Sequence, residues 1–414
     1  MARRRWRFRA RAGGEGRASY LHGLEKPERI RRATTTPGSD MTRASRIDSY
    51  PLSPMQQGML FHHLTARQPG VDFQQIVCAL HERVELEAFR RAWQQVLDRH
   101  DALRTSFRWD RLDHPVQEVH GAVTLPFDVQ DWRDVPAGLQ QQRFDAWLEA
   151  ERAQELDLSS APLIRVTLIQ LAAAEFRCVW SFPHPLLDGP SLPIVLRDVF
   201  AYYDAACRGE ELHLAPPRPY REYIAWLDAR DTSHDESFWR ALLAGIASPT
   251  AIAMAHPSGA GRGEQQRRLS AALTTSLREL ADLHALTIDT LVLGAWAVLM
   301  CRYSGAEDVL FGAVRAPRRS TVPGADAMVG MFTNTLPVRA QVAAATPLLP
   351  WLHELRQQQL SVREFEHTPL ANVQQWSGLP AGTALFESIV VFDRHRSTPS
   401  CAPAVDAGPS ARSS

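Results

Sequence analysis

The chain has 414 residues, of which 45% are hydrophobic and 22% are charged, and its formal net charge is zero. This composition suffices for about two or three globular domains and excludes a wholly disordered or collagen-like chain. No apolar run approaches the roughly 18 residues of a membrane-spanning helix, and the arginine-rich N-terminus is not followed by the apolar segment of a signal peptide. We therefore expect a cytoplasmic protein without membrane association.

Lysine is almost absent from the chain. Lys26 is the only lysine among the 46 lysine and arginine residues, a skew that is typical of high-GC bacterial genes. The body of the chain thus has no lysine to bind a phosphate, as in a P-loop, or to form a Schiff base with pyridoxal phosphate. The five cysteines lie far apart without a CxxC pair, which disfavours a disulfide framework and a structural zinc site.

The two ends differ in composition from the rest of the chain. Residues 1–46 carry a net charge of +9, so the remainder carries −9. A basic arm can bind nucleic acid or a membrane, but we favour a solvated, disordered segment over residues 1–47 with no nucleic-acid partner. Residues 397–414 are rich in Ser, Pro, Ala and Gly without apolar periodicity, which predicts a second disordered tail.

Helical and strand patterns alternate between these ends, which predicts an α/β fold. In chain order, the first part predicts a helix at 86–99, a strand at 105–109, a helix at 140–153, strands at 163–171 and 176–182, and a helix at 191–203. The second part predicts helices at 220–229, 236–243 and 274–303, the last broken near Thr287, and buried strands at 307–313 and 388–392. Between the two parts, the proline-rich residues 215–219 cannot continue a helix or an inner strand. We therefore expect one lobe over 48–214 and another over 215–396.

The segment from Pro183 to Ser191 carries the clearest chemical signal, an HxxxDG pattern where a strand runs into a helix. His184 lies just past the strand, and histidine titrates near neutral pH, which suits it to proton transfer. Asp188 could fix the loop through an ion pair, Gly189 would allow a tight turn, and the N–H groups at the helix start could face a developing oxyanion. The alternative is a structural histidine in a proline-rich turn, and the spacing alone does not decide between them. A zinc site is disfavoured, because His184 and Asp188 supply only two of the usual three ligands.

A series of six motifs resembles the condensation domain of nonribosomal peptide synthetases, within the chloramphenicol acetyltransferase-like superfamily. The motifs are YPLSPMQQGMLF at 50–61, RHDALRTSF at 99–107, PHPLLDG at 183–189, YREYIAW at 220–226, VGMFTNTLPVR at 329–339, and HTPL at 367–370 with LFES at 385–388. They occur in the family's order over nearly all of residues 48–396. Six ordered motifs are far more specific than any one of them.

The resemblance implies two acetyltransferase-like lobes arranged as a V, with a tunnel along the cleft. Donor and acceptor peptidyl carrier proteins would each extend a phosphopantetheine arm, and an adenylation domain would lie on a neighbouring chain or module. The acceptor amine would attack the donor thioester to form an amide, with no intrinsic cofactor and no metal. The product would belong to secondary metabolism, such as an antibiotic peptide.

The resemblance also implies roles for individual residues. His184 would act as a general base or would orient the amine and stabilise the tetrahedral state. Asp188 would pair with an arginine of the other lobe, for which Arg318 is the first candidate and Arg339 the second. Gly189 would supply backbone approach or an N–H group, and Asn334 would be a buried amide that satisfies main-chain groups.

The chain departs from the family pattern at two places. The first histidine of the HHxxxDG motif is Pro183, and Pro185 follows His184, so we expect a stiffened backbone that either presents or misplaces the imidazole. The chain also stops before the family's seventh motif, which predicts a truncated second lobe with an exposed sheet edge.

Two functions of different classes follow. One is an acyltransferase that forms peptide bonds, and the other is a catalytically silent or truncated module that only docks carrier proteins. The retained His184, Asp188 and Gly189 favour the enzyme.

Overall fold

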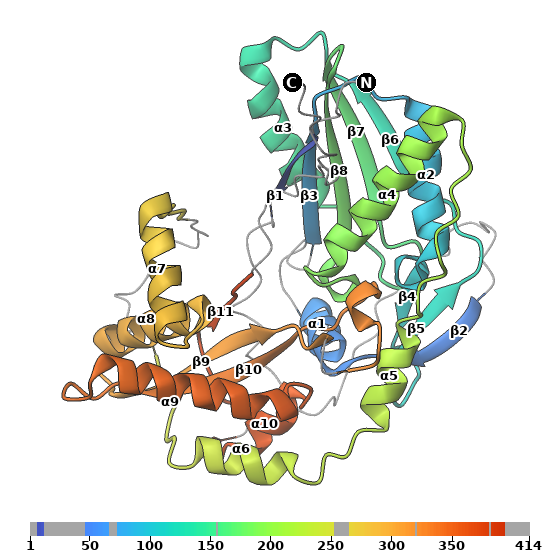
Figure 1. Cartoon of the computed structure of the whole chain (residues 1–414). Helices are drawn as coiled ribbons and strands as arrows, with labels where there is room; N and C mark the ends of the chain where they lie inside the picture. Colours follow the sequence, from blue (N-terminus) through green and yellow to red (C-terminus); the bar gives the residue numbers. More distant parts are fainter. Residues whose placement is uncertain are drawn as a thin grey trace, which may run out of the picture.

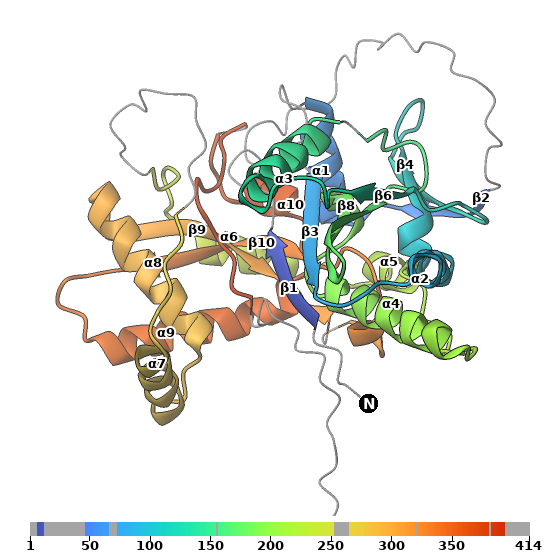
Figure 2. The same ribbon diagram turned by 90° about the horizontal axis from the view of Figure 1, so that it is seen from above.

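The computed structural model describes the backbone of residues 6–11. It describes backbone and side chains for residues 46–65, 73–154, 156–251, 265–318, 321–380 and 382–393. The predicted tail at 397–414 and most of the predicted disordered segment at 1–47 lie outside these residues. Figures 1 and 2 show two groups of strands, one in the first half of the chain and one in the second, each covered by its own helices.

A five-stranded sheet forms the centre of the first half. Its strands are β1 (Trp6–Arg11), β3 (Phe73–Leu80), β8 (Glu175–Pro183), β7 (Arg165–Ala172) and β6 (Phe127–Asp131), in that order across the sheet. The β7–β8 hairpin is antiparallel, whereas β6 joins β7 in parallel. The hairpin therefore places the end of β8, where the HxxxDG segment begins, next to β3.

Helices cover both faces of this sheet (Figure 1). One face packs against α2 (Leu86–Arg99) and α4 (Ser191–Arg208), and the other packs against α3 (Ala137–Arg152). The buried residues of α2 include Phe89, Trp93 and Val96, which recur at the three- and four-residue spacing that puts side chains on one helical face. Trp93 packs edge-on against Trp180 of β8 with ring centroids 5.4 Å apart, so the helix anchors the strand that precedes the loop.

Strand β1 lies within residues 1–47, for which the high positive charge predicts disorder. Its backbone pairs antiparallel with β3 from Trp6 opposite Leu80 to Arg11 opposite Gln75. The sequence WRFRAR alternates apolar residues with arginine at the two-residue period of a strand, a signal hidden by the high charge. The edge of β3 offers the unpaired backbone groups that such a segment can meet.

A smaller three-stranded sheet packs together with two helices. Strands β2 (Arg46–Pro51), β5 (Val116–His120) and β4 (Thr105–Arg108) form this sheet in that order. A cluster of buried side chains joins it to α1 (Pro54–Thr65), to α5 (Arg221–Asp228) and to the segment before β10. This cluster, which includes Tyr50, Tyr220, Tyr223 and Phe332, is where the two halves of the chain share a core.

The second half has a three-stranded sheet in the order β10 (Asn334–Gln341), β9 (Asp308–Arg315) and β11 (Ile389–Val390). Helices α7 (Ala271–Leu283), α8 (Ile288–Ser304) and α9 (Leu348–Ser361) pack on one face, and α6 (Asp235–Leu243) and α10 (Leu370–Trp376) pack on the other. The predicted strand at 388–392 is only two residues long and runs parallel to β9.

The predicted break near Thr287 is present, since α7 ends at Leu283 and the Thr287 hydroxyl caps α8 by accepting from the Thr290 N–H. No single helix among the described residues is long and apolar enough to cross a membrane. Helices α7 and α8 pass such a test only as a pair, which is bent by 103°.

Candidate functional site

The HxxxDG segment forms a short loop between β8 and α4. Strand β8 ends at Pro183, a 3-10 turn covers His184–Leu186, and α4 begins at Ser191. Between His184 and Ser191, only His184, Gly189 and Pro190 reach the surface, and the other side chains are buried. The loop therefore presents its histidine and its glycine to solvent while its middle is fixed in the interior.

Helix α1 contacts the turn that begins at His184. His184 is partly exposed, with its Nδ1 atom buried. A residue before proline favours extended backbone, yet His184 opens a 3-10 turn ahead of Pro185. The buried Gln56 of α1 donates its amide to the Pro185 carbonyl at 3.1 Å, and Leu186 is buried as well. The hydrogen bond from Gln56 and the burial of Leu186 thus outweigh the preference of a residue before proline for extended backbone.

Asp188 is the centre of a buried polar cluster, with 1% of its surface exposed. Its Oδ1 accepts from Arg318 Nη2 at 2.5 Å and from the Ser191 N–H at 3.0 Å, and its Oδ2 accepts from the Phe332 N–H at 3.2 Å. The Asp188 N–H donates to the Gly330 carbonyl at 3.2 Å. Ser191 Oγ also lies 2.6 Å from Oδ1, so both oxygens of this carboxylate are matched by polar groups, as a buried charge requires.

Arg318 is itself buried, at 5% exposure, and fully engaged on its two terminal nitrogens. Nη1 donates to the carbonyls of Ala325 and Met328 at 2.9 and 2.6 Å, and its guanidinium carbon lies 4.2 Å from the centre of the Phe332 ring. The ion pair therefore joins the loop of the first half to the segment that precedes β10 in the second half.

The other two support residues of the sequence analysis lie elsewhere. Arg339, the second candidate partner of Asp188, instead pairs with Asp308 at 2.6 Å and donates to the carbonyls of Leu242 and Ala244. It cannot reach Asp188 because its place on β10 directs it to the neighbouring strand. Asn334 is buried, and its Nδ2 donates to the carbonyls of Glu366 and Thr368 at 3.0 and 2.8 Å.

Gly189 differs from its predicted role in the turn. Its φ is not in the left-handed region, and an added Cβ would meet nothing within 4 Å. The turn is made by ordinary backbone that any residue can adopt, so the sequence argument from glycine's flexibility is wrong here. Gly189 is exposed and has open space above its backbone, as several other surface glycines of the described residues do.

Sequence reasoning did not single out three residues that hold this site: Gln56, Ser191 and Gly330. An aspartate ahead of a helix is a helix-start signal, and Asp188 accepts from the Ser191 N–H, but that signal does not indicate the Ser191 hydroxyl. Gly330 is fixed by packing, since an added Cβ would overlap the Tyr220 ring, whose hydroxyl donates to the Met331 carbonyl. No local pattern indicates such a contact between residues 110 positions apart.

The tyrosines beneath the loop remain protonated. Burial is the main cause that raises the pKa of Tyr50, Tyr220 and Tyr223, and the charge of Asp188 raises the last two further. These phenols can donate hydrogen bonds but cannot serve as bases near neutral pH. Of the titratable side chains in residues 184–191, His184 is the one that is partly exposed, whereas Asp188 is buried.

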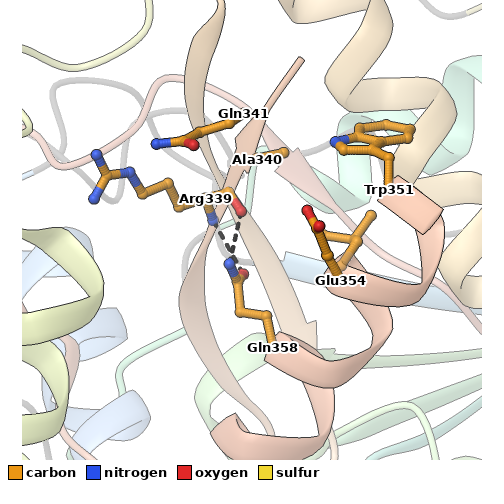
Figure 3. A pocket seen from close by; sticks show the side chains of 7 residues that line it. Arg339, Ala340, Gln341, Trp351, Glu354 and Gln358 are labelled. Carbon is orange, nitrogen blue, oxygen red and sulfur yellow. Dashed lines mark hydrogen bonds between the residues drawn. The ribbon is translucent and has the colours of Figure 1, made fainter. Parts of the chain in front are cut away.

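A pocket of about 220 Å³ lies elsewhere, between β10 and α9 (Figure 3). Gln358 bridges its wall by accepting from the Arg339 N–H and donating to the Arg339 carbonyl, at 3.3 and 2.8 Å. Its lining contains none of the HxxxDG residues. Within the described ranges, no three His, Cys, Asp or Glu side chains are grouped so that they could hold a metal ion.

Comparisons with known proteins identify the family of this chain. Residues 46–401 match the family model of the condensation domain. One of the linear gramicidin synthase proteins of Brevibacillus parabrevis is 42% identical over 352 residues, which cover 84% of this chain and 7% of that protein. The chain thus spans less than a tenth of this curated relative.

Two solved structures show a similar fold. The first condensation domain of the calcium-dependent antibiotic synthetase superposes with a TM-score of 0.71 at 16% identity, over 85% of this chain and 82% of that one. The starter condensation domain of rhizomide synthetase superposes with a TM-score of 0.69 at 22% identity, over 83% and 78%. The chain therefore has the mixed α/β fold of these domains and belongs to the condensation domain family of nonribosomal peptide synthetases.

Proposed function

We propose that this chain is an acyltransferase that forms an amide bond between two carrier-bound substrates. The donor is an acyl or peptidyl thioester on the phosphopantetheine arm of one carrier protein, and the acceptor is an aminoacyl group on a second carrier. The acceptor nitrogen bonds to the donor carbonyl carbon, the carbon–sulfur bond breaks, and one amine proton ends on the departing thiol. An adenylation domain on a neighbouring chain or module supplies the aminoacyl group.

The arrangement of the HxxxDG loop carries the proposal. His184 is partly exposed at the end of a strand that is clamped on both faces, so its imidazole can meet a substrate without losing its position. In the proposed reaction, His184 accepts the amine proton as the carbon–nitrogen bond forms. Asp188 and Arg318 are structural supports, because every polar contact that fixes the carboxylate lies in the interior.

The open space at Gly189 supports a place for the substrate beside the histidine. An added Cβ at this exposed position, two residues before the start of α4, would meet nothing within 4 Å. The helix start itself offers no free donor to an oxyanion, because the N–H groups of Ser191 and Leu192 already donate to Asp188 and Gly189, and Pro190 and Pro193 have none.

The proposed architecture has two acetyltransferase-like lobes, over 48–214 and 215–396, arranged as a V with the substrates entering the cleft. The separate sheets with their own cores support this division. Residues 215–219 form neither helix nor strand, as expected for a connection between lobes. Asn334 and Arg339 support the second lobe through main-chain contacts and the Asp308 pair.

The test compares His184→Ala with His213→Ala, a control that removes an exposed histidine far from the loop in sequence. Carrier proteins loaded with acyl and aminoacyl thioesters serve as probes, and mass spectrometry measures the amide. We expect His184→Ala to lower turnover about a hundredfold or more, the scale of a positioned proton-transfer group, and the control to match the native chain. Restoring the family's first histidine with Pro183→His should raise turnover.

Equal turnover of the native chain and His184→Ala would contradict the assignment of His184. If every variant binds carriers but none forms an amide, the chain is instead a docking module, which is the alternative function.

A further inference from the structure

The hydroxyl of Ser191 lies at the junction of the loop with the second half of the chain. Ser191 is the first residue of α4 and is completely buried. Its Oγ lies 2.6 Å from Asp188 Oδ1, 2.8 Å from Arg318 Nη2, and 2.9 and 3.0 Å from the carbonyl oxygen and the nitrogen of Gly330. One atom thus contacts four polar atoms of three residues, which belong to two distant parts of the sequence.

The chemistry of a hydroxyl fits this set of neighbours. The Oγ accepts from the Arg318 guanidinium and from the Gly330 N–H, which uses both of its lone pairs. Its single proton goes either to the Asp188 carboxylate or to the Gly330 carbonyl. Alanine at this position would leave the Gly330 N–H buried without its acceptor and would remove one bond of Arg318.

The fold has other connections at the same junction, so loss of this hydroxyl alone does not separate the halves. The Asp188–Arg318 ion pair, the Asp188 N–H to Gly330 carbonyl bond and the Phe332 N–H to Asp188 bond do not involve the Ser191 side chain. The hydroxyl therefore restricts the position of the loop at a junction that other contacts already hold together. Its loss should loosen the loop locally.

We propose that Ser191 is a positioning residue, which fixes the loop at 184–191 against residues 328–332 of the second half. Because the loop's exposed residues, His184 and Gly189, lie within eight positions of Ser191, the clamp sets where they lie relative to the second half. Its importance for turnover rests on the proposed amide-forming function. A displacement of about 1 Å in a reacting group can lower a rate a hundredfold.

The first test measures hydrogen–deuterium exchange in the full chain. Ser191→Ala should exchange about tenfold or more faster than the native protein in peptides that cover 184–192 and 328–333, because a buried donor has lost its acceptor. Ser237→Ala is the matched control, since its exposed hydroxyl donates to the His234 carbonyl of the adjacent turn. Unchanged exchange in either peptide of Ser191→Ala would overturn the clamp.

The second test measures amide formation with the carrier-bound thioesters that the native chain accepts. Ser191→Ala should lower kcat by roughly ten- to a hundredfold with little change in KM, and Ser191→Thr, which keeps the hydroxyl, should restore most of the rate. Faster exchange with an unchanged kcat would overturn the positioning role. If the native chain forms no amide, the proposed function fails, while the exchange experiment still decides whether Ser191 fixes the loop.

Discussion

Replacement of Asp188 by asparagine isolates the charge of the ion pair that joins the loop to Arg318. The two side chains are almost the same size, so the change leaves packing in place, removes the negative charge and turns one of the two accepting oxygens into an NH2 donor. Both partners are buried, with side-chain exposures of 0% for Asp188 and 5% for Arg318. The guanidinium would then be a buried positive charge without a counter-charge.

The expected loss follows from the contacts that remain. Removal of one partner of a buried ion pair typically costs about 3–5 kcal/mol. Arg318 keeps its bonds to the carbonyls of Ala325 and Met328 and to Ser191, and the asparagine oxygen can still accept. We therefore expect the lower end, a decrease of about 3 kcal/mol in the free energy of unfolding, or roughly a hundredfold in the folding equilibrium.

Equilibrium urea unfolding of the full chain measures this change. Asp308→Asn is the control, because it breaks a similar pair with Arg339 in which the Asp308 side chain is 36% exposed. Solvent screens that pair, so we expect a loss of about 1 kcal/mol or less. The ordering of the two variants depends on burial alone, since the chemical change is the same.

A double variant tests the reasoning further. Asp188→Asn combined with Arg318→Met removes both charges and should recover part of the stability that the single change loses. The reasoning is refuted if Asp188→Asn is as stable as the native chain. It is also refuted if the double variant loses as much free energy of unfolding as the two single variants lose together.

Three further outcomes follow from buried groups. Burial, and then the charge of Arg230, lower the pKa of His367 from 6.5 to about 4. The folded state therefore binds fewer protons than the unfolded state between these values, and the free energy of unfolding should fall by about 2 kcal/mol between pH 6.5 and pH 5 in urea titrations. Gly330→Ala should lower the free energy of unfolding by about 2 kcal/mol, because its methyl group would overlap the Tyr220 ring. Gly189→Ala should change it by less than about 0.5 kcal/mol in the same assay, because its methyl group would enter open space.

Controls are available for each of these outcomes. His367→Gln should remove the part of the pH dependence of the free energy of unfolding that His367 causes. If the free energy of unfolding of this variant still falls equally between pH 6.5 and pH 5, another group causes the effect. Gly189→Ala is the control for Gly330→Ala. Equal free energies of unfolding for the two variants would contradict the overlap of the Gly330→Ala methyl group with the Tyr220 ring. If Gly189→Ala is stable but slow in amide formation, the open space at that position is used by the substrate.

Local sequence patterns determined most of the secondary structure. The apolar spacing that predicts a helix at 86–99 reflects one buried face of α2, and the break near Thr287 follows from a side chain that caps a helix. Such features depend on residues within one or two helical turns, so they can be deduced from a short window of sequence. The ordered motifs likewise identified the family, because each is a contiguous segment.

Only the tertiary structure decided which distant groups meet. The sequence offered Arg318 as the first and Arg339 as the second candidate partner of Asp188, and only the packing of the two halves brings Arg318 to it across 130 positions. The same packing places Gly330 against Ser191 and leaves space above Gly189, neither of which a local pattern specifies. The sequence alone thus located the histidine and the loop that carries it. The contacts that hold the loop come from the second half, because a buried charge must be matched wherever the folded chain provides a partner.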